Sequence, residues 1–519
     1  MPLPSTKDLV RLSRERTFLL KASAAVTMVA VLLALLISLV ATPSRFTREG
    51  MIAAGDRESL VPLIRFGSPV PTESQTLTCA DLVRDGSQNL FAEEIEASLE
   101  DLRNDPSVEP VRLWWAGLNA PDPAPFLVKL ETIPPETPYR DEFMGDLEFK
   151  RANHKAALRH YLSAPERFPD SLYSRRSAVF LSRFEEDSGL LRKLLNDASF
   201  RGAFEANDLL SYFTYLRDYP SLARSVLATE WQGMRSPYVI PAVFTAAIWF
   251  FILLAFGEQT RGRIATALIA FLLGMVSASL TLFAVMIQED LFGFIFHEGD
   301  TPLGQFIYFL SGVALREESL KLLCFLPLVI LLRRKSSPLE MLLFAGMTGL
   351  GFAFQENLAY FEVGAGTFTA WIRLLTANVL HFSLTGVAGY YLWRMLARGF
   401  RGWEEFLVSY LAVVFAHAIY NAIISMPSLA AYAPLNPILV AVIAYQYFDP
   451  LRDQMEKAGM HRRFSPLGIF VLGSVVLACT VLVSSAFSQP FRFALGAFVS
   501  TVGAMIPLAF AFISRFRDL

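Results

Sequence analysis

Two adjacent carboxylates lie near the middle of a stretch that is long enough to cross a bilayer. Residues 306–332 carry Glu317 and Glu318 there, with Arg316 before them and Lys321 after them. A charged side chain at the centre of a membrane helix costs at least roughly 2.5 to 3.5 kcal/mol. On a helix Lys321 faces both carboxylates, but one ammonium neutralises about one of them. The other carboxylate requires a partner from another helix, a proton or water.

Three more ionisable side chains fall inside predicted membrane helices: Glu356, His381 and His417. Measured from the outer end of each span, Glu317 lies roughly 17 Å deep and His417 about 14 Å deep. His381 lies about 11 Å and Glu356 about 8 Å from that side. Polar groups inside a membrane normally face the bundle interior or a water-filled cavity. A carboxylate beside an imidazole in such a place can activate water.

These residues have polar or aromatic companions on the same helix faces. The companions are Phe352 and Tyr360 for Glu356, Asn378 and Thr385 for His381, and Asn421 for His417. A single histidine in a helix bundle is more often a hydrogen-bonded packing residue, and a single glutamate can cap a helix or bind water. Four ionisable groups in one band favour a reactive site over packing.

Composition sets the class of protein. The chain has 519 residues, of which 53% are hydrophobic, and its charges concentrate in the first half, as in a membrane protein with a soluble insert. The net charge of -2 and the lack of a basic patch interleaved with aromatic residues argue against nucleic-acid binding. Cys79, Cys324 and Cys479 are scattered and odd in number, which excludes a disulfide framework and a zinc ribbon.

The first apolar run covers residues 22–41, and basic residues precede it. It is too long for the core of a signal peptide and is predicted to be the first transmembrane helix, a signal anchor that keeps residues 1–21 in the cytoplasm. Residues 42–236 contain no span and most of the charges, which predicts an extracytoplasmic domain. Its first part is rich in proline between Pro106 and Pro138, and its second part is predicted to be helical.

One segment of this domain, within residues 140–230, resembles a unit of the tetratricopeptide helix-turn-helix family. The resemblance rests on Gly145, Ala157, Tyr161, Ala164 and Pro169. A step of about 34 residues along the chain recovers only Ala198 among the signature positions. The segment is therefore either a helical-repeat module that docks a protein partner or a plain helical hairpin.

The rest of the chain is predicted to be almost continuous membrane helix. The apolar runs are 238–257, 264–288, 306–332, 341–361, 374–393, 406–426, 432–448, 464–487 and 493–514. With the first anchor they give about ten transmembrane helices and an all-α multi-pass membrane protein with a largely helical insert. Residues 237–426 form the predicted membrane domain that contains the reactive groups, and its core is residues 300–425. Residues 427–519 are predicted to add three further transmembrane helices.

Basic residues in the loops predict the topology. Most arginines and lysines between spans fall on one side, and the short loops on the opposite side have only Arg373 and Arg492, each at the edge of a span. Since cytoplasmic loops carry the excess of basic residues, both termini are predicted to be cytoplasmic. We expect a multi-pass protein of the cell (inner) membrane.

The order of the polar residues resembles a known family. The quoted features are the paired Glu317 and Glu318 with Lys321, the sequence GFAFQENLAYF around Glu356 and Asn357, His381 with Thr385 and Gly389, and His417 with Asn421. Together they resemble the four motifs of the PrsW family, which is related to the CAAX prenyl endopeptidases and bacteriocin-processing membrane proteases. The similarity covers about residues 300–425, and no motif position is missing.

This resemblance implies proteolysis inside the membrane, with a single-span membrane protein as substrate. In the founding case of the family the substrate is an anti-sigma factor. By the resemblance Glu317 would activate water, with Glu318 and Lys321 tuning it, and His381 would share or relay the proton. His417 and Asn421 would polarise the scissile carbonyl group and stabilise its oxyanion. Glu356 would protonate the leaving group or orient the substrate, with Asn357 and Thr385 in support.

The sequence leaves the cofactor open. Glu317, Glu356, His381 and His417 are candidate ligands for a catalytic zinc, which takes three protein ligands and a water. No HExxH pair or other local metal-binding spacing is present, and the same residues serve a metal-free glutamate mechanism. The family name favours the metalloprotease. Membrane lipid is the other expected partner, and no nucleic acid is expected.

Two other classes of function remain open at this point. A proton- or cation-coupled transporter also uses glutamate and histidine at mid-membrane, but it typically has paired broken helices from an internal repeat. Only Pro327 interrupts the span that holds Glu317. The other alternative is a non-catalytic membrane scaffold that keeps the same fold.

Overall fold

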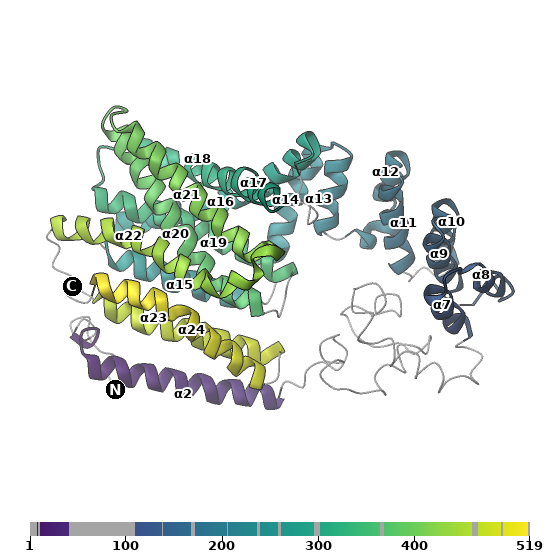
Figure 1. Ribbon diagram of the computed structural model, residues 1–519, viewed down its shortest axis with the longest axis horizontal. Coiled ribbons are helices and arrows are strands. Elements are labelled where there is room, and N and C mark those ends of the chain that lie inside the picture. The colour runs from purple at the N-terminus through teal and green to yellow at the C-terminus, as the bar shows by residue number, and fades with distance from the viewer. Residues whose placement is uncertain are drawn as a thin grey trace. The chain divides into compact units, whose positions relative to one another are not determined.

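The computed structural model describes most of the chain as helices connected by short segments (Figure 1). The described residues are 8, 11–40, 109–137, 139–167, 172–204, 206–235, 239–257, 261–294, 301–363, 368–458, 465–488 and 491–516. No strand occurs in these ranges, so the predicted all-α class is confirmed. Cys79, Pro169 and the first part of the proline-rich segment lie outside the described residues.

Five of the described helices are long and apolar enough to cross a membrane. They are α2 (Arg16–Val40), α16 (Arg261–Phe292), α21 (Trp403–Ser425), α23 (Pro466–Ser488) and α24 (Phe491–Phe516). A shorter apolar helix is α15 (Val239–Ala255). These helices agree with a membrane protein, whereas the count of ten spans stays a prediction.

The remaining predicted spans also lie on helices. They are α17 (Pro302–Ile307), η3 (Tyr308–Ala314), α18 (Leu315–Leu332), α19 (Pro338–Val363), α20 (Phe368–Ala397), η4 (Pro427–Leu435) and α22 (Asn436–Ala458). Helix α18 shows why composition alone does not identify such spans, because it begins with an arginine, two glutamates and a lysine within its first seven residues.

The chain divides into two compact units, Pro43–Asp218 and a larger unit of Met1–Thr42 with Tyr219–Leu519. The described part of the first unit is a series of short helices. They are α7 (Glu109–Asn119), α8 (Ala124–Glu131), α9 (Arg140–Lys150), α10 (His154–Arg167), α11 (Leu172–Phe184), α12 (Ser188–Asn196), η2 (Ala198–Ala203) and α13 (Ala206–Tyr215).

The core of this unit contains a buried carboxylate that accepts hydrogen bonds from several side chains. Asp146 accepts hydrogen bonds from Trp114 Nε1 at 3.0 Å and from the hydroxyls of Tyr161 and Tyr173 at 2.6 Å each. Gly145 lies against the Tyr161 ring, where a Cβ atom would collide with it. This contact explains the glycine and tyrosine of the proposed repeat unit as a close approach of α9 and α10. Membership of the tetratricopeptide family stays a prediction.

Helix α14 (Tyr219–Gly233) belongs to the larger unit by its contacts. It packs on α16 and α19, and the Ser279 hydroxyl of α16 donates a hydrogen bond to the Glu230 carboxylate. The residues of α14 belong to the segment 42–236, which is predicted to be an extracytoplasmic domain. Its boundary at residue 236 therefore falls after a helix that packs on the membrane helices.

The first candidate membrane span packs against the last but one. Helix α2 lies against α23, and small residues such as Ala30 and Ala34 meet Cys479 and Ala486 in their contact. Close to the start of α23, the Ser465 amide donates a hydrogen bond of 3.1 Å to Ser13 Oγ. The C-terminal helices thus hold α2 within the larger unit.

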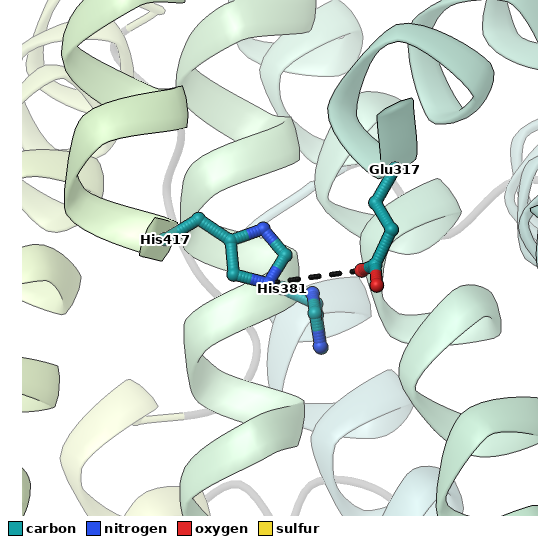
Figure 2. Close-up of side chains that lie close together, drawn as sticks. All are labelled: Glu317, His381 and His417. Atoms are coloured by element: carbon teal, nitrogen blue, oxygen red, sulfur yellow. Dashed lines mark ion pairs between the residues drawn. The ribbon is translucent and has the colours of Figure 1, made fainter. Parts of the chain in front are cut away.

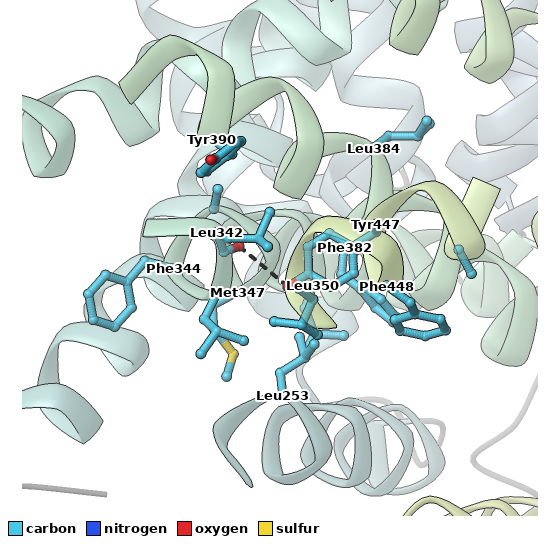
Figure 3. Packing of buried hydrophobic residues seen from close by; sticks show 14 of the residues in the cluster. Leu253, Leu342, Phe344, Met347, Leu350, Phe382, Leu384, Tyr390, Tyr447 and Phe448 are labelled. Atoms are coloured by element: carbon cyan, nitrogen blue, oxygen red, sulfur yellow. Dashed lines mark hydrogen bonds between the residues drawn. The ribbon is translucent and has the colours of Figure 1, made fainter. Parts of the chain in front are cut away.

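Helices α19 and α20 form the centre of the larger unit and make its most extensive helix-helix contact. Figure 3 shows the core around them, where the Tyr447 hydroxyl donates a hydrogen bond of 3.3 Å to the Leu342 carbonyl oxygen. Glycine allows the closest approaches. Gly349 faces the carbonyl group of His381, and Gly351 faces the carbonyl group of Phe271, with no room for a side chain at either position.

We expect Gly351→Ala to destabilise the larger unit by about 1 to 3 kcal/mol or more, because the added methyl group meets backbone of α16 that cannot rotate away. The matched control is Gly262→Ala on α16, where nothing lies within 4 Å and the change is expected to be neutral or stabilising by up to about 1 kcal/mol. Thermal unfolding in detergent measures both variants. Equal unfolding temperatures for the two variants would contradict this packing.

Candidate active site

The predicted reactive residues begin one turn after a π-helix. Residues Tyr308–Ala314 form η3 between α17 and α18, and the amide of Leu315 donates to the carbonyl group of Leu310, five residues earlier. π-helical turns are rare and occur frequently at functional sites. Phe309 and Ala314 pack on Val414 and Ala418 of α21, so the π-helix lies against the helix that carries His417. Glu317 and Glu318 follow in the first turn of α18.

Lys321 is the centre of the buried network. Its ammonium group donates to Glu318 Oε1 at 2.7 Å and to His381 Nδ1 at 2.8 Å, and it lies 3.5 Å from Glu317 Oε2. It also sits 3.8 Å from the centre of the Phe352 ring. The side chain is fully buried, which is costly for an ammonium group unless it is paired and hydrogen-bonded. The sequence predicted its pairing with the glutamates but not its contact with His381.

Glu318 joins three helices. Its Oε1 atom accepts from His417 Nδ1 at 2.9 Å in addition to Lys321, and its Oε2 atom accepts from Thr385 Oγ1 at 3.4 Å. Because an ionised carboxylate only accepts hydrogen bonds, His417 Nδ1 carries a proton. In the neutral imidazole His417 Nε2 is then the unprotonated nitrogen, and it lies 3.7 Å from Glu317 Oε2.

His381 is held between a cation and a carboxylate. Lys321 has only donors to offer, so His381 Nδ1 accepts, and the neutral ring carries its proton on Nε2. This nitrogen donates to Glu356 Oε2 at 2.9 Å. Glu356, His381, Lys321, Glu318 and His417 thus form one continuous chain of hydrogen bonds.

Glu317 lies beside this chain with one oxygen available. Figure 2 shows its carboxylate pointing toward His417 and His381 from α18. The Oε2 atom is buried and makes no hydrogen bond to any of the residues that the structure describes. One ligand atom each from Glu317, His381 and His417 lies within 4.8 Å of the others, which is the donor set of a possible metal site. Glu356 contacts His381 but is not part of that set.

The other predicted site residues differ in how closely they are connected to the buried network. Asn357 donates a long hydrogen bond of 3.4 Å to Asn378 on α20, close to His381 along that helix. Asn421 is half-buried one turn after His417. Its predicted role therefore rests on that position along the helix.

Sequence reasoning missed one polar pair beside the site. Arg316 Nη1 donates to Gln288 Oε1 on α16 at 2.9 Å, one residue before Glu317. In the sequence, Arg316 is one of the charges inside the span of residues 306–332, and Gln288 is the last residue of the apolar run 264–288. A charged residue inside one predicted span and a polar residue at the end of another are the signal that could have paired them.

Taken together, the apolar helices and the buried glutamate-histidine network define a helical membrane protein with the chemical groups of a hydrolase. Residues 262–447 match the family model described as PrsW family intramembrane metalloprotease. The resemblance to this family of intramembrane proteases is therefore confirmed over these residues, and the match includes α16 and much of α22, beyond the motifs. No curated protein and no solved structure matches the chain.

Proposed function

We propose that this protein is an intramembrane endopeptidase that hydrolyses a peptide bond in a single-span membrane protein. The observation that carries the proposal is the Oε2 atom of Glu317, which lies buried beside two imidazoles and 3.5 Å from the Lys321 ammonium group but accepts no hydrogen bond from the described residues. A carboxylate oxygen without a hydrogen-bond donor in such a place is available to accept a proton from water. The family match supports the same activity.

In this proposal Glu317 takes one proton from a water molecule, whose oxygen attacks the scissile carbonyl carbon. His417 Nε2 faces Glu317 and can receive this proton from it, and the protonated Nε2 then donates a hydrogen bond to the carbonyl oxygen as negative charge develops there. The C–N bond then breaks, and the amine leaves with the same proton, returned from His417 or Glu317, while Glu356 orients the substrate. His381 links Glu356 to Lys321 and thereby holds Glu356 in reach of the substrate.

Lys321 and Glu318 act through the other residues. Lys321 offsets negative charge and fixes His381, and Glu318 fixes the proton of His417 on Nδ1. Thr385 orients Glu318, and Asn357 supports α20 through Asn378. For Asn421 we propose a second donor to the oxyanion, on the basis of its position one turn from His417.

The residues present fit a zinc ion. The site has three carboxylates and one ammonium group, so with neutral imidazoles it has two negative charges in excess. Glu317, His417 and His381 would hold the ion, and Glu318 already contacts the second nitrogen of His417, as acidic groups do behind zinc-bound histidines. His381 becomes a ligand only if Lys321 or Glu356 releases one of its nitrogens. When bound, zinc supplies an activated water.

We expect the purified protein to contain about one zinc per chain and to lose it in His417→Ala, since zinc at a catalytic site takes about three protein ligands. Mass spectrometry of metals measures this independently of activity. The matched control is Cys324→Ala, which removes a potential ligand of α18 outside the cluster. A fully active protein without metal would contradict the zinc assignment and leave the metal-free glutamate mechanism.

We further propose that the protein lies in the cell (inner) membrane with both termini in the cytoplasm and residues 42–236 outside. The distribution of basic loop residues supports this orientation. The helical unit would then dock a protein partner or the substrate. Cleavage of an anti-sigma factor, as in the founding case of the family, is the form of regulated proteolysis that we propose.

Fragments of membrane proteins provide the test in cells. Membranes from cells with the wild-type protein should contain at least one single-span protein cut within its apolar segment. The same protein should be intact in cells with Glu317→Gln. Identical fragments in both kinds of cell would overturn the proposal and favour the non-catalytic scaffold.

A further inference from the structure

Two polar side chains beside Glu317 present hydrogen-bond donors that nothing described in the structure accepts. Arg316 lies on α18, and Gln288 lies near the end of α16 that is expected to face outward. The guanidinium group uses Nη1 to donate to Gln288 Oε1. Arg316 Nε and Gln288 Nε2 are both buried and have no hydrogen-bond partner among the described residues.

Leaving these donors unpaired is costly. A buried polar group without a hydrogen bond costs about 1 to 3 kcal/mol, and more when it is charged. The two atoms without a partner, Arg316 Nε and Gln288 Nε2, are both donors. A molecule that pairs with them must therefore bring acceptors.

The negative charges around Arg316 favour a neutral acceptor over an anion. The Arg316 guanidinium already interacts electrostatically with Glu289 and with Glu317. A second anion at this place would meet the negative charge of Glu317, which follows Arg316 directly in the chain. A neutral acceptor such as a carbonyl oxygen meets no such repulsion.

A membrane-spanning substrate supplies such acceptors when it is cut. Helices cross membranes because each backbone group has its partner within the helix. A peptide bond must leave the helix to reach Glu317, and the carbonyl oxygens that this frees cost several kcal/mol each in hydrocarbon.

On the basis of the proposed function, we propose that Arg316 and Gln288 form a subsite that donates hydrogen bonds to main-chain carbonyl oxygens of the unwound substrate beside the scissile bond. The subsite recognises backbone and not side chains. It would therefore accept different sequences provided that the segment unwinds.

Gln288→Glu is the sharpest variant, because it keeps the shape and the oxygen that accepts from Arg316 but removes the amide donors. The substrate is a synthetic fluorescent peptide that spans the segment cut in the cellular test. We expect KM to rise about five- to tenfold with kcat nearly unchanged, as for one lost hydrogen bond. Ser277→Ala is the matched control on α16, because the Ser277 hydroxyl is buried and bonds only within its own helix, to the Gly274 carbonyl group.

A change in the peptide separates substrate contact from a structural effect. Single amide-to-ester replacements on either side of the cut bond weaken the carbonyl acceptor without touching the protein. At one position the ester should raise KM for the wild type and have no further effect in Gln288→Glu. The subsite proposal would be overturned if the ester changed KM equally for both proteins at every position, or if Gln288→Glu had the KM of the wild type. Either result would leave the proposed protease activity in place. No Glu317-dependent cleavage of the unmodified peptide would overturn both.

Discussion

Replacing Glu317 by Gln is expected to lower kcat for peptide cleavage by about 10²- to 10⁴-fold, the range for loss of a general base. The amide keeps the shape of the side chain but cannot accept the proton of water. Glu317 Oε2 accepts no hydrogen bond from the described residues, so the substitution removes its ion pair with Lys321 and the carboxylate charge that faces His417 Nε2. The variant should remain folded, and the loss should appear in kcat and kcat/KM alike.

Glu340→Gln is the matched control for this prediction. Glu340 is also a buried glutamate of the larger unit, but it pairs with Arg263 at the other end of the bundle and has no contact with the cluster. We expect it to lower stability and to leave kcat within about twofold, as is usual for residues that do not touch the reaction. Equal kcat values for the wild type and Glu317→Gln would remove Glu317 from the mechanism.

Replacing Lys321 by Met is expected to destabilise the larger unit by about 3 to 5 kcal/mol, because removal of one partner leaves a buried charge uncompensated. Glu318 is fully buried and would keep only His417 and Thr385 as partners. His381 would lose the donor to its Nδ1 atom as well. Thermal unfolding in detergent, followed by tryptophan fluorescence, measures the change.

The double variant Lys321→Met with Glu318→Gln tests the cause of this loss. Removal of the carboxylate charge should recover part of the stability, and the two substitutions should be strongly non-additive because the residues are in contact. Unfolding of Lys321→Met at the wild-type temperature would show that the ion pair does not stabilise the bundle.

The sequence allowed much of the site to be predicted because helical spacing determines which residues share a face. The separation of Lys321 from Glu317 and Glu318 predicted their contacts, and the structure has both. The histidines of α20 and α21 were expected in the same band as Glu317, and they lie next to its carboxylate. These predictions agree with the structure because the spacing of residues along a helix determines which side chains share a face.

Other features depend on how helices pack, which residue spacing does not specify. The estimated depths of Glu317 and Glu356 differed by about 9 Å at 1.5 Å per residue, yet both side chains join one network. A depth estimated from residue number is valid only when all spans begin in one plane and are regular α-helices. The π-helix before Glu317 and the differing lengths of the helices break that assumption. Residue spacing also could not predict the contact of Lys321 with His381 or the Arg316–Gln288 pair, since each of these contacts joins two helices.

The most direct measurement is the mass of the products made by the reconstituted protein from a single-span peptide in isotope-labelled water. Hydrolysis with water activated at Glu317 predicts a new carboxyl end within the apolar segment that carries one labelled oxygen, and no such product from Glu317→Gln. A cut outside the apolar segment, or the same labelled product from both proteins, would contradict the account.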